Sequence, residues 1–594
     1  MKFNRLLILL FLTIFSVSCN TDDGILGNQN PGNETSGNFS DNFGNTINSD
    51  FLGRVVDVNN NPIEGVTITI GNMTTPTDAN GVFIMNDALV FERFGYVKAE
   101  KAGYIHGSRA VVPSSRTNKI EIMLLEETVI QTLNNGETAT VVLANGASVS
   151  LDGNYRNPDG SDYTGSIDVI MHMLDPVDDN MELQMPGMLY AENIDGNERM
   201  LQTLGMLAVE LRGDNGEDLN LADGSTSEII IPLDPSLVAT APTSIPLWYF
   251  DEVNGYWKEE GEAILVGNQY VGTVTHFSFW NCDIPAEAVN LCVTVTDENE
   301  NPLANLTVNI TSSTYGTRSG YTNENGEVCG LIPSNETLEI NVYSFDTCGN
   351  IILYTSDIGP YSTDSLLDIT VMSDTEAIAE TVTGTFNTCD GNTVTNGYVI
   401  LTYGSQEFYE TVDNGVFEIN MVRCSDDNIF SIEANDYDNV QTTGIINYTF
   451  ATPNTNIGSI ASCNDVDEFI TYQIDDQPVI TYNFDIGNFE EGPDSIYISY
   501  FEEDNIGANG YYFNLGLFTQ ALGTHNSDDV DIFIDLLDIN GDSINPNNSP
   551  NTTVNLTAFG VTGEYIDMNF TGTYIDQDNI THTISGGIHV IRDF

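Results

Sequence analysis

The residues of this 594-residue chain that are best suited to chemistry are its histidines and cysteines. No histidine begins a His-x-x-Glu or His-Glu-x-x-His pattern, so the zinc-peptidase motifs are missing. A Gly-x-Ser-x-Gly elbow and a Walker-type phosphate loop are missing too. His276 and Cys282 are close enough in sequence to form a nucleophilic pair, but an exported protein uses such a cysteine more often in a disulfide or a core. The sequence therefore predicts a protein that is not an enzyme and has no organic cofactor.

The cysteines are clustered in one part of the chain. Seven of the eight lie between residues 282 and 463, which in an exported protein indicates disulfides and one odd thiol. Connectivity does not follow from spacing alone. We predict a disulfide between Cys329 and Cys348, and one pair among Cys389, Cys424 and Cys463.

Oxygen-rich loops are the only metal sites that the sequence suggests. Asp538, Asn540 and Asp542 alternate as in the first half of a calcium-binding loop, although no glutamate closes the loop at the proper spacing. Residues 57–61 and 297–301 also alternate Asp and Asn side chains. Each of these segments either binds Ca²⁺ or is a solvated hairpin tip.

Aromatic residues are dense between residues 245 and 283. All three tryptophans of the chain, Trp248, Trp257 and Trp280, fall in this segment. Exposed tryptophans form platforms for sugar rings, whereas clustered aromatics at strand spacing usually form a core. A ligand platform and a hydrophobic core are therefore both open interpretations here, and the core is favoured.

The charge of the chain excludes one class of partner. There are 16 Lys and Arg residues against 87 Asp and Glu residues, which gives a formal net charge of -71 and a pI near 4.1. Such a field repels phosphate backbones, so we predict that the protein does not bind nucleic acid. A hydrophobic fraction of 41% and an aromatic fraction of 10% indicate a folded protein with an acidic surface.

The N-terminus has the pattern of an export signal. A short basic start and an apolar run precede Cys19, and acidic residues follow it. This pattern resembles a bacterial lipoprotein signal, and the acids after the cysteine resemble the surface-export signal of lipoproteins in the Bacteroidota. The resemblance implies that residues 1–18 are removed and that Cys19 carries the lipid. Attachment to the outer membrane would then be through this anchor alone, with the protein at the cell surface. Ordinary secretory cleavage is the alternative.

From about residue 51 the chain reads as short alternating strands separated by turn signals. The closest approaches to helical periodicity are residues 126–133 and 283–289. The fold class is therefore all-β. An internal repeat relates residues 56–68 to 295–308, each with a polar turn that ends in a proline, and a weaker third copy begins near residue 384.

These repeated residues resemble the carboxypeptidase regulatory-like family. The shared pattern is Asp-x-x-Gly/Asn-x-Pro followed by Thr-Asp-x-x-Gly-x-Phe, and it fits residues 52–125 well, 290–373 fairly well and 380–463 loosely. The third copy lacks the proline. The resemblance implies a transthyretin-like or Ig-like β-sandwich that is an accessory module without catalytic residues of its own, in a superfamily that includes carbohydrate-binding modules.

The predicted organisation is a series of β-sandwich domains behind a signal peptide and a flexible tether. Its parts are a signal peptide (1–18), a tether (19–50), a first regulatory-like sandwich (51–126), an aromatic-rich β domain (127–286), a second sandwich (287–374), a third, divergent sandwich (375–464) and a C-terminal sandwich (465–594).

The function that we predict from these features is a non-enzymatic binding or adhesion scaffold at the cell surface. Its partner would be an extracellular glycan or another outer-membrane protein. A glycan-binding accessory of a polysaccharide-uptake system is the first alternative, motivated by the tryptophans. A secreted hydrolase with an unrecognised active site is the second.

Overall fold

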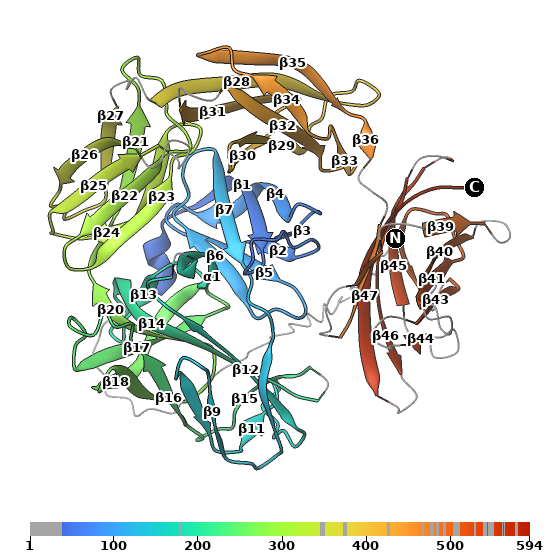
Figure 1. Cartoon of the computed structure of the whole chain (residues 1–594). Helices are drawn as coiled ribbons and strands as arrows, with labels where there is room; N and C mark the ends of the chain where they lie inside the picture. The colour runs from blue at the N-terminus through green and yellow to red at the C-terminus, as the bar shows by residue number, and fades with distance from the viewer. Residues whose placement is uncertain are drawn as a thin grey trace, which may run out of the picture. The chain divides into compact units, whose positions relative to one another are not determined.

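The computed structural model describes residues 38–594 except 179, 215, 345–350, 372–376, 425–427, 466–468, 476–479, 483–485, 491–494, 503–510, 528–529, 538–542, 545–551, 561, 563–564 and 576–579. The regular secondary structure of the described chain, drawn in Figure 1, is almost entirely β-strand, as the sequence predicts. Within it, no helix is long and apolar enough to cross a membrane.

The first repeat is a sandwich of a three-stranded and a four-stranded sheet. Its central strand β1 pairs antiparallel with β4 and parallel with β7. The smaller sheet has the order β4 (Val82–Phe91), β1 (Thr46–Val56), β7 (Thr117–Met123), and the larger has the order β3 (Met73–Pro76), β2 (Thr67–Ile70), β5 (Gly95–Glu100), β6 (Gly107–Val111).

The second repeat has the same topology. In it, β21 pairs antiparallel with β24 and parallel with β27. The sheets have the orders β24 (Glu327–Pro333), β21 (Ala288–Thr296), β27 (Ser365–Thr370) and β23 (Gly316–Tyr321), β22 (Thr307–Ser312), β25 (Leu338–Tyr343), β26 (Ile352–Ile358).

The third repeat keeps this plan and extends it. Strand β28 pairs antiparallel with β31 and parallel with β35, and the second sheet gains strands at one edge. The sheets have the orders β31 (Val416–Cys424), β28 (Ala377–Thr388), β35 (Asn454–Ser462) and β30 (Gln406–Thr411), β29 (Gly397–Tyr403), β32 (Ile429–Asp436), β33 (Gln441–Thr442), β36 (Asn464–Asp465), with β34 (Ile446–Thr449) also on β32. The sequence repeat is thus a repeat of topology.

Between the first two repeats lies the aromatic-rich domain, which is built on one 13-stranded sheet. Its strands are β8 (Val129–Leu133), β9 (Ala139–Val142), β10 (Ser148–Leu151), β11 (Tyr155–Arg156), β12 (Ile167–Leu174), β13 (Tyr190–Glu192), β14 (Glu198–Arg212), β15 (Asp218–Leu221), β16 (Ser227–Pro232), β17 (Ser244–Asp251), β18 (Tyr256–Val266), β19 (Gln269–Val274) and β20 (Phe279–Ala286). The single α-helix of the described residues, α1 (Met181–Gln184), also belongs to this domain.

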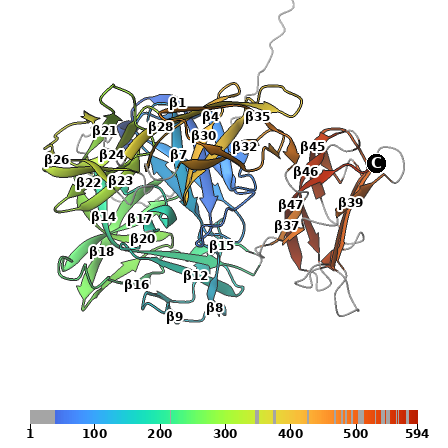
Figure 2. The same ribbon diagram turned by 45° about the horizontal axis from the view of Figure 1, so that its top comes forward.

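The C-terminal domain packs two antiparallel sheets around a core of its own. Figure 2 shows β45, β46 and β47 in one sheet and β39 in the other. The sheets have the orders β38 (Ile480–Tyr482), β37 (Phe469–Ile474), β47 (Thr581–Ile591), β46 (Tyr565–Ile575), β45 (Thr552–Phe559), β42 (Gly523–Asn526) and β39 (Ile486–Phe489), β40 (Ile496–Glu502), β41 (Tyr511–Leu517), β43 (Ile532–Leu537), β44 (Ser543–Ile544).

The polar turn and the glycine of the repeat both have clear structural reasons. Asp57 Oδ1 accepts hydrogen bonds from the backbone N–H groups of Asn59 (2.7 Å) and Asn61 (2.9 Å), which closes the turn. Gly81 has a φ of +69°, and a Cβ there would lie 2.4 Å from the Val55 carbonyl oxygen. Glycine is therefore required where the returning strand meets the first one.

One local prediction is wrong. The tether ends earlier than residue 50, because a short 3₁₀-helix, η1 (Phe39–Phe43), and then β1 already belong to the first repeat. Phe39 and Phe43 are buried against Phe94, Tyr190 and Tyr256, and this aromatic contact orders a segment whose composition otherwise favours disorder. The two segments closest to helical periodicity, 126–133 and 283–289, form parts of β8, β20 and β21, which agrees with the all-β prediction.

Candidate functional site

The three tryptophans form a core. Trp248, Trp257 and Trp280 are each 0% exposed, and they belong to two hydrophobic clusters of the aromatic-rich domain. Trp248 Nε1 donates to the Asp283 carbonyl oxygen (3.2 Å) and Trp280 Nε1 to the His276 carbonyl oxygen (3.0 Å). The core interpretation that the sequence favoured is therefore confirmed, and the alternative of a ligand platform is wrong, because no ring face is open to a sugar.

A Ser-His-Glu constellation occurs that the sequence analysis missed. His106 Nε2 lies 3.0 Å from Ser108 Oγ, and His106 Nδ1 lies 3.8 Å from Glu252 Oε2. Ser108 is only 2% exposed, and its Oγ accepts a hydrogen bond from the Gly187 N–H (3.1 Å). Burial, with a smaller contribution from Lys98, lowers the pKa of His106 to about 3. A substrate cannot reach this serine. Because His106 and Ser108 belong to the first repeat and Gly187 and Glu252 to the aromatic-rich domain, these contacts link the two domains. The only sequence signal was the pattern His-x-Ser.

Some of the predicted metal and lipid residues lie outside the described part of the chain, whereas the two Asp- and Asn-rich turns lie within it. Asp538, Asn540, Asp542 and Cys19 lie outside the described residues. In the turn at 57–61, Asp57 uses both carboxylate oxygens within the turn, since Oδ2 accepts from Asn61 Nδ2 (2.9 Å), and 297–301 repeats this pattern. These two turns therefore have the hydrogen bonds of hairpin tips.

The disulfides differ in part from the predicted ones. Cys292 pairs with Cys329, so the predicted Cys329–Cys348 pair is wrong; Cys348 itself lies outside the described residues. The two partners are opposite each other on β21 and β24, with Cα atoms 4.1 Å apart, and this register was not read from the sequence. The prediction of a pair among Cys389, Cys424 and Cys463 is confirmed by Cys389–Cys463. Cys424 is also disulfide-bonded, and the free thiol among the described cysteines is the buried Cys282.

A buried contact joins the first and third repeats. Leu52, Val82 and Ile84, on the face of the first repeat that points away from its own core, form one buried cluster with Tyr398 and Ile400 of the third. Tyr398 is 0% exposed. An apolar sheet face that would otherwise be exposed is thus covered by another repeat of the same chain.

Polar groups surround this cluster and fix its geometry. The Tyr398 hydroxyl donates to Asp78 Oδ2 (2.6 Å) and accepts from Asn80 Nδ2 (2.9 Å). Burial raises the pKa of Asp78 to about 6, although the hydrogen bonds from Tyr398 and two backbone N–H groups lower it. The same two repeats are also joined by an ion pair, in which Lys119 Nζ lies 3.1 Å from Glu410 Oε2; burial raises the pKa of Glu410 while Lys119 lowers it.

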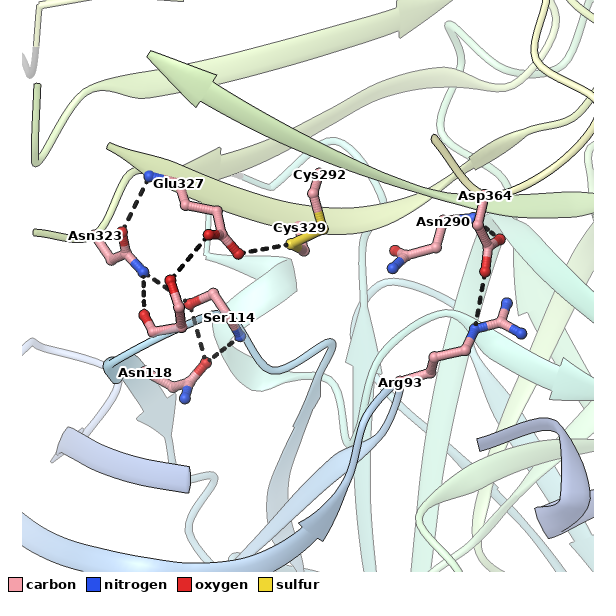
Figure 3. Close-up of a disulfide and its surroundings, with 10 residues drawn as sticks. Arg93, Ser114, Asn118, Asn290, Cys292, Asn323, Glu327, Cys329 and Asp364 are labelled. Carbon is pink, nitrogen blue, oxygen red and sulfur yellow. Dashed lines mark hydrogen bonds and ion pairs between the residues drawn. A yellow bond between two sulfur atoms is a disulfide. The ribbon is translucent and has the colours of Figure 1, made fainter. Parts of the chain in front are cut away.

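A second contact joins the first and second repeats beside the Cys292–Cys329 disulfide (Figure 3). Ser115 Oγ donates to Glu327 Oε2 (2.9 Å), and Asn323 Nδ2 donates to Ser114 Oγ (3.0 Å) and to the Ser115 carbonyl oxygen (2.7 Å). The second and third repeats are linked as well, because Asn305 Nδ2 donates to the Asn420 carbonyl oxygen (2.8 Å). All three repeats therefore contact one another directly.

Comparisons with known proteins add little to this description. No family model matches the chain, and no curated protein matches it. Among solved structures, a streptococcal ancillary pilin is 12% identical over 38% of this chain and 95% of its own, with a TM-score of 0.12. The shaft pilin of Lactobacillus rhamnosus GG is 12% identical over 30% of this chain and 100% of its own, with a TM-score of 0.14. The major pilin subunit of Bacillus cereus is 10% identical over 70% of this chain and 100% of its own, with a TM-score of 0.11. At these TM-scores the similarity supports no statement about activity or partners.

Proposed function

We propose that the protein is a non-enzymatic, exported scaffold that holds β-sandwich domains in a fixed arrangement at the cell surface. The observation that supports this most is the docking of the repeats, in which Tyr398 of the third repeat fills an apolar face of the first. Disulfides in two of the repeats support an oxidising, extracytoplasmic location. The shared topology supports the resemblance of the repeats to regulatory-like domains, which stays a prediction.

The attachment that we propose is a lipid on Cys19 in the outer membrane, with the folded domains facing outward. Growth with an alkyne-labelled fatty acid tests it: the full-length protein should take up label, and the Cys19→Ser variant should take up none. Intact cells should also lose the protein to added protease. Equal labelling of the variant would overturn the lipid anchor, and protection from protease would overturn surface exposure.

The partner that we propose is a neighbouring outer-membrane protein or an extracellular glycan, bound without chemical change. Co-purification after cross-linking on intact cells and a glycan array with the delipidated protein distinguish the two. The burial of the tryptophans removes the main support for a dedicated glycan-uptake role. Turnover in a hydrolase panel that persists in a Ser108→Ala variant would point to an unrecognised active site and contradict the proposal.

Calcium binding at Asp538, Asn540 and Asp542 remains part of this proposal. Titration of the metal-free protein with Ca²⁺ should show one site that is lost in an Asp538→Asn, Asp542→Asn double variant. Unchanged calcium binding in that variant would place the ion elsewhere, and the absence of binding would remove it from the account.

A further inference from the structure

The outward face of β21 and β24 brings three metal-ligating side chains together. Cys292 and Cys329 are opposite each other, and Glu327 lies two residues before Cys329 on the same strand face. Their potential ligand atoms all lie within 4.8 Å of one another, and Glu327 Oε1 is 3.4 Å from Cys329 Sγ. A disulfide sulfur carries no proton, so Cys329 Sγ does not donate a hydrogen bond to Glu327 Oε1. The two atoms are in contact without a hydrogen bond between them.

The second oxygen of the same carboxylate is already held from the first repeat. Ser115 Oγ donates to Glu327 Oε2 (2.9 Å), and Asn325 Nδ2 in turn donates to Ser115 Oγ (2.9 Å). Metal sites have this arrangement, in which an outer hydrogen bond fixes a carboxylate so that its other oxygen faces the ion. Figure 3 shows the Glu327 side chain directed toward Cys329, with Ser114 of the first repeat on the facing segment.

We propose that the reduced form of the Cys292–Cys329 pair, together with Glu327, is a binding site for a thiophilic divalent cation such as Zn²⁺. Two thiolates, one carboxylate and one water complete the four-coordinate geometry that Zn²⁺ prefers. Leu291 and Val293, on either side of Cys292, are buried in the core of the second repeat, so the sulfurs face away from that core. The pair and Glu327 are half-buried, which leaves them open to a reductant and to the ion.

The chemistry balances with a low-molecular-weight thiol as reductant. Two thiol molecules give two electrons and two protons to the disulfide, forming two protein thiols and one oxidised dimer of the reductant. The cation then displaces the two thiol protons as it binds. Since the same glutamate bonds the metal and Ser115, cation binding is coupled to the contact between the first and second repeats. This proposal is independent of the proposed cell-surface function.

Titration with Co²⁺ tests the proposal on the full chain after reduction by a phosphine and its removal without oxygen. We expect thiolate-to-cobalt charge-transfer absorption in the reduced protein, none in the oxidised protein, and none after Cys292→Ser with Cys329→Ser. The Cys389→Ser, Cys463→Ser variant is the matched control and should keep the absorption. Zn²⁺ should displace the bound Co²⁺.

The supporting residues give a second, independent readout on a protein that keeps both cysteines. Ser115→Ala should weaken Co²⁺ binding about 10-fold to 100-fold, as loss of an outer-shell hydrogen bond does. Glu327→Gln should weaken it at least as much. Absorption that persists in the Cys292→Ser, Cys329→Ser variant, or an affinity that Glu327→Gln leaves unchanged, would overturn the site.

Discussion

In the smaller sheet of the first repeat, Leu52 lies opposite Ile84; in the second repeat, Cys292 lies opposite Cys329. These positions are equivalent, because Val55 N–H bonds the Gly81 carbonyl in one repeat and Val295 N–H bonds the Gly326 carbonyl in the other. The leucine and isoleucine are buried under the third repeat, whereas the cysteines are half-buried beside a polar contact.

The third repeat has yet another pair at the same positions. By the equivalent bond from Phe386 N–H to the Gly415 carbonyl, the matching residues are Thr383 and Glu418, which are paired in register. Thr383 is half-buried and Glu418 is exposed. One backbone plan therefore accepts an apolar pair, a disulfide or a polar pair, and the choice follows what covers that face of the sheet.

Among the substitutions that test this comparison, Leu52→Ala should lower the free energy of unfolding most. Removing a buried leucine side chain from a contact between two repeats should lower the free energy of unfolding by about 2–5 kcal/mol. Thr383→Ala, at the equivalent position in the third repeat, should change it by less than about 0.5 kcal/mol. Urea unfolding followed by circular dichroism checks both. Similar losses of unfolding free energy in the two variants would mean that the burial of Leu52 under the third repeat does not add stability.

Loss of the Cys292–Cys329 disulfide should have the next largest effect on the free energy of unfolding. Replacing Cys292 and Cys329 by serine should cost about 2–4 kcal/mol of unfolding free energy, because the closed loop in the unfolded chain is lost. Replacing them by Leu and Ile, the residues of the first repeat, should not restore that stability, since the part of the first repeat beside this face makes polar contacts. Thermal unfolding of the three proteins measures the difference, and full recovery with Leu and Ile would contradict the account.

The titration of Asp78 predicts a pH dependence of stability that belongs to the contact between the first and third repeats. Its pKa is raised by burial from an ordinary 3.8 to about 6, so its contribution to stability is full below pH 4 and is lost as the pH rises through 6. Relative to Asp78→Asn, the wild type should lose about 1–2 kcal/mol between pH 4 and 7. Midpoints of thermal unfolding measured in parallel show this, and parallel pH profiles would refute it.

The smallest expected effect is at the first–second contact. Ser115→Ala removes the hydroxyl that donates to Glu327, and should cost about 1 kcal/mol of unfolding free energy in the oxidised protein. Both hydrogen bonds are exposed, but Ser166 bonds Asp214 within the aromatic-rich domain, so Ser166→Ala is the control and should cost less. Equal costs would show that the contact adds nothing beyond a surface hydrogen bond.

Local signals predicted the fold well, and contacts between distant segments were harder to predict. The turn at Asp57 and the glycine at 81 are specified within a few residues, so the repeat could be recognised from sequence. The docking of the third repeat could have been predicted from one sequence pattern. Apolar residues continue from 82 to 85 without alternation, which indicates a strand buried on both faces.

The wrong predictions of the tether and of the Cys329 disulfide share one cause, which is that they used nearby residues although the actual partners lie far along the chain. Cys329 bonds a cysteine 37 residues away on a neighbouring strand. Phe39 is ordered by Tyr190 and Tyr256, which follow it by more than a hundred residues. Composition around Phe39 could not reveal partners so far away, and the Ser108–His106–Glu252 group was hidden for the same reason.

The central claim is that the repeats form one docked unit, and the distance between the first and third repeats tests it most directly. Spin labels at Leu89→Cys and Glu418→Cys, both exposed strand positions, permit a pulsed electron paramagnetic resonance measurement in the oxidised full chain, where the free Cys282 is buried. We expect one narrow distance distribution that broadens when Tyr398→Ala removes the side chain between the repeats. A broad distribution in the protein with Tyr398 intact would contradict the account.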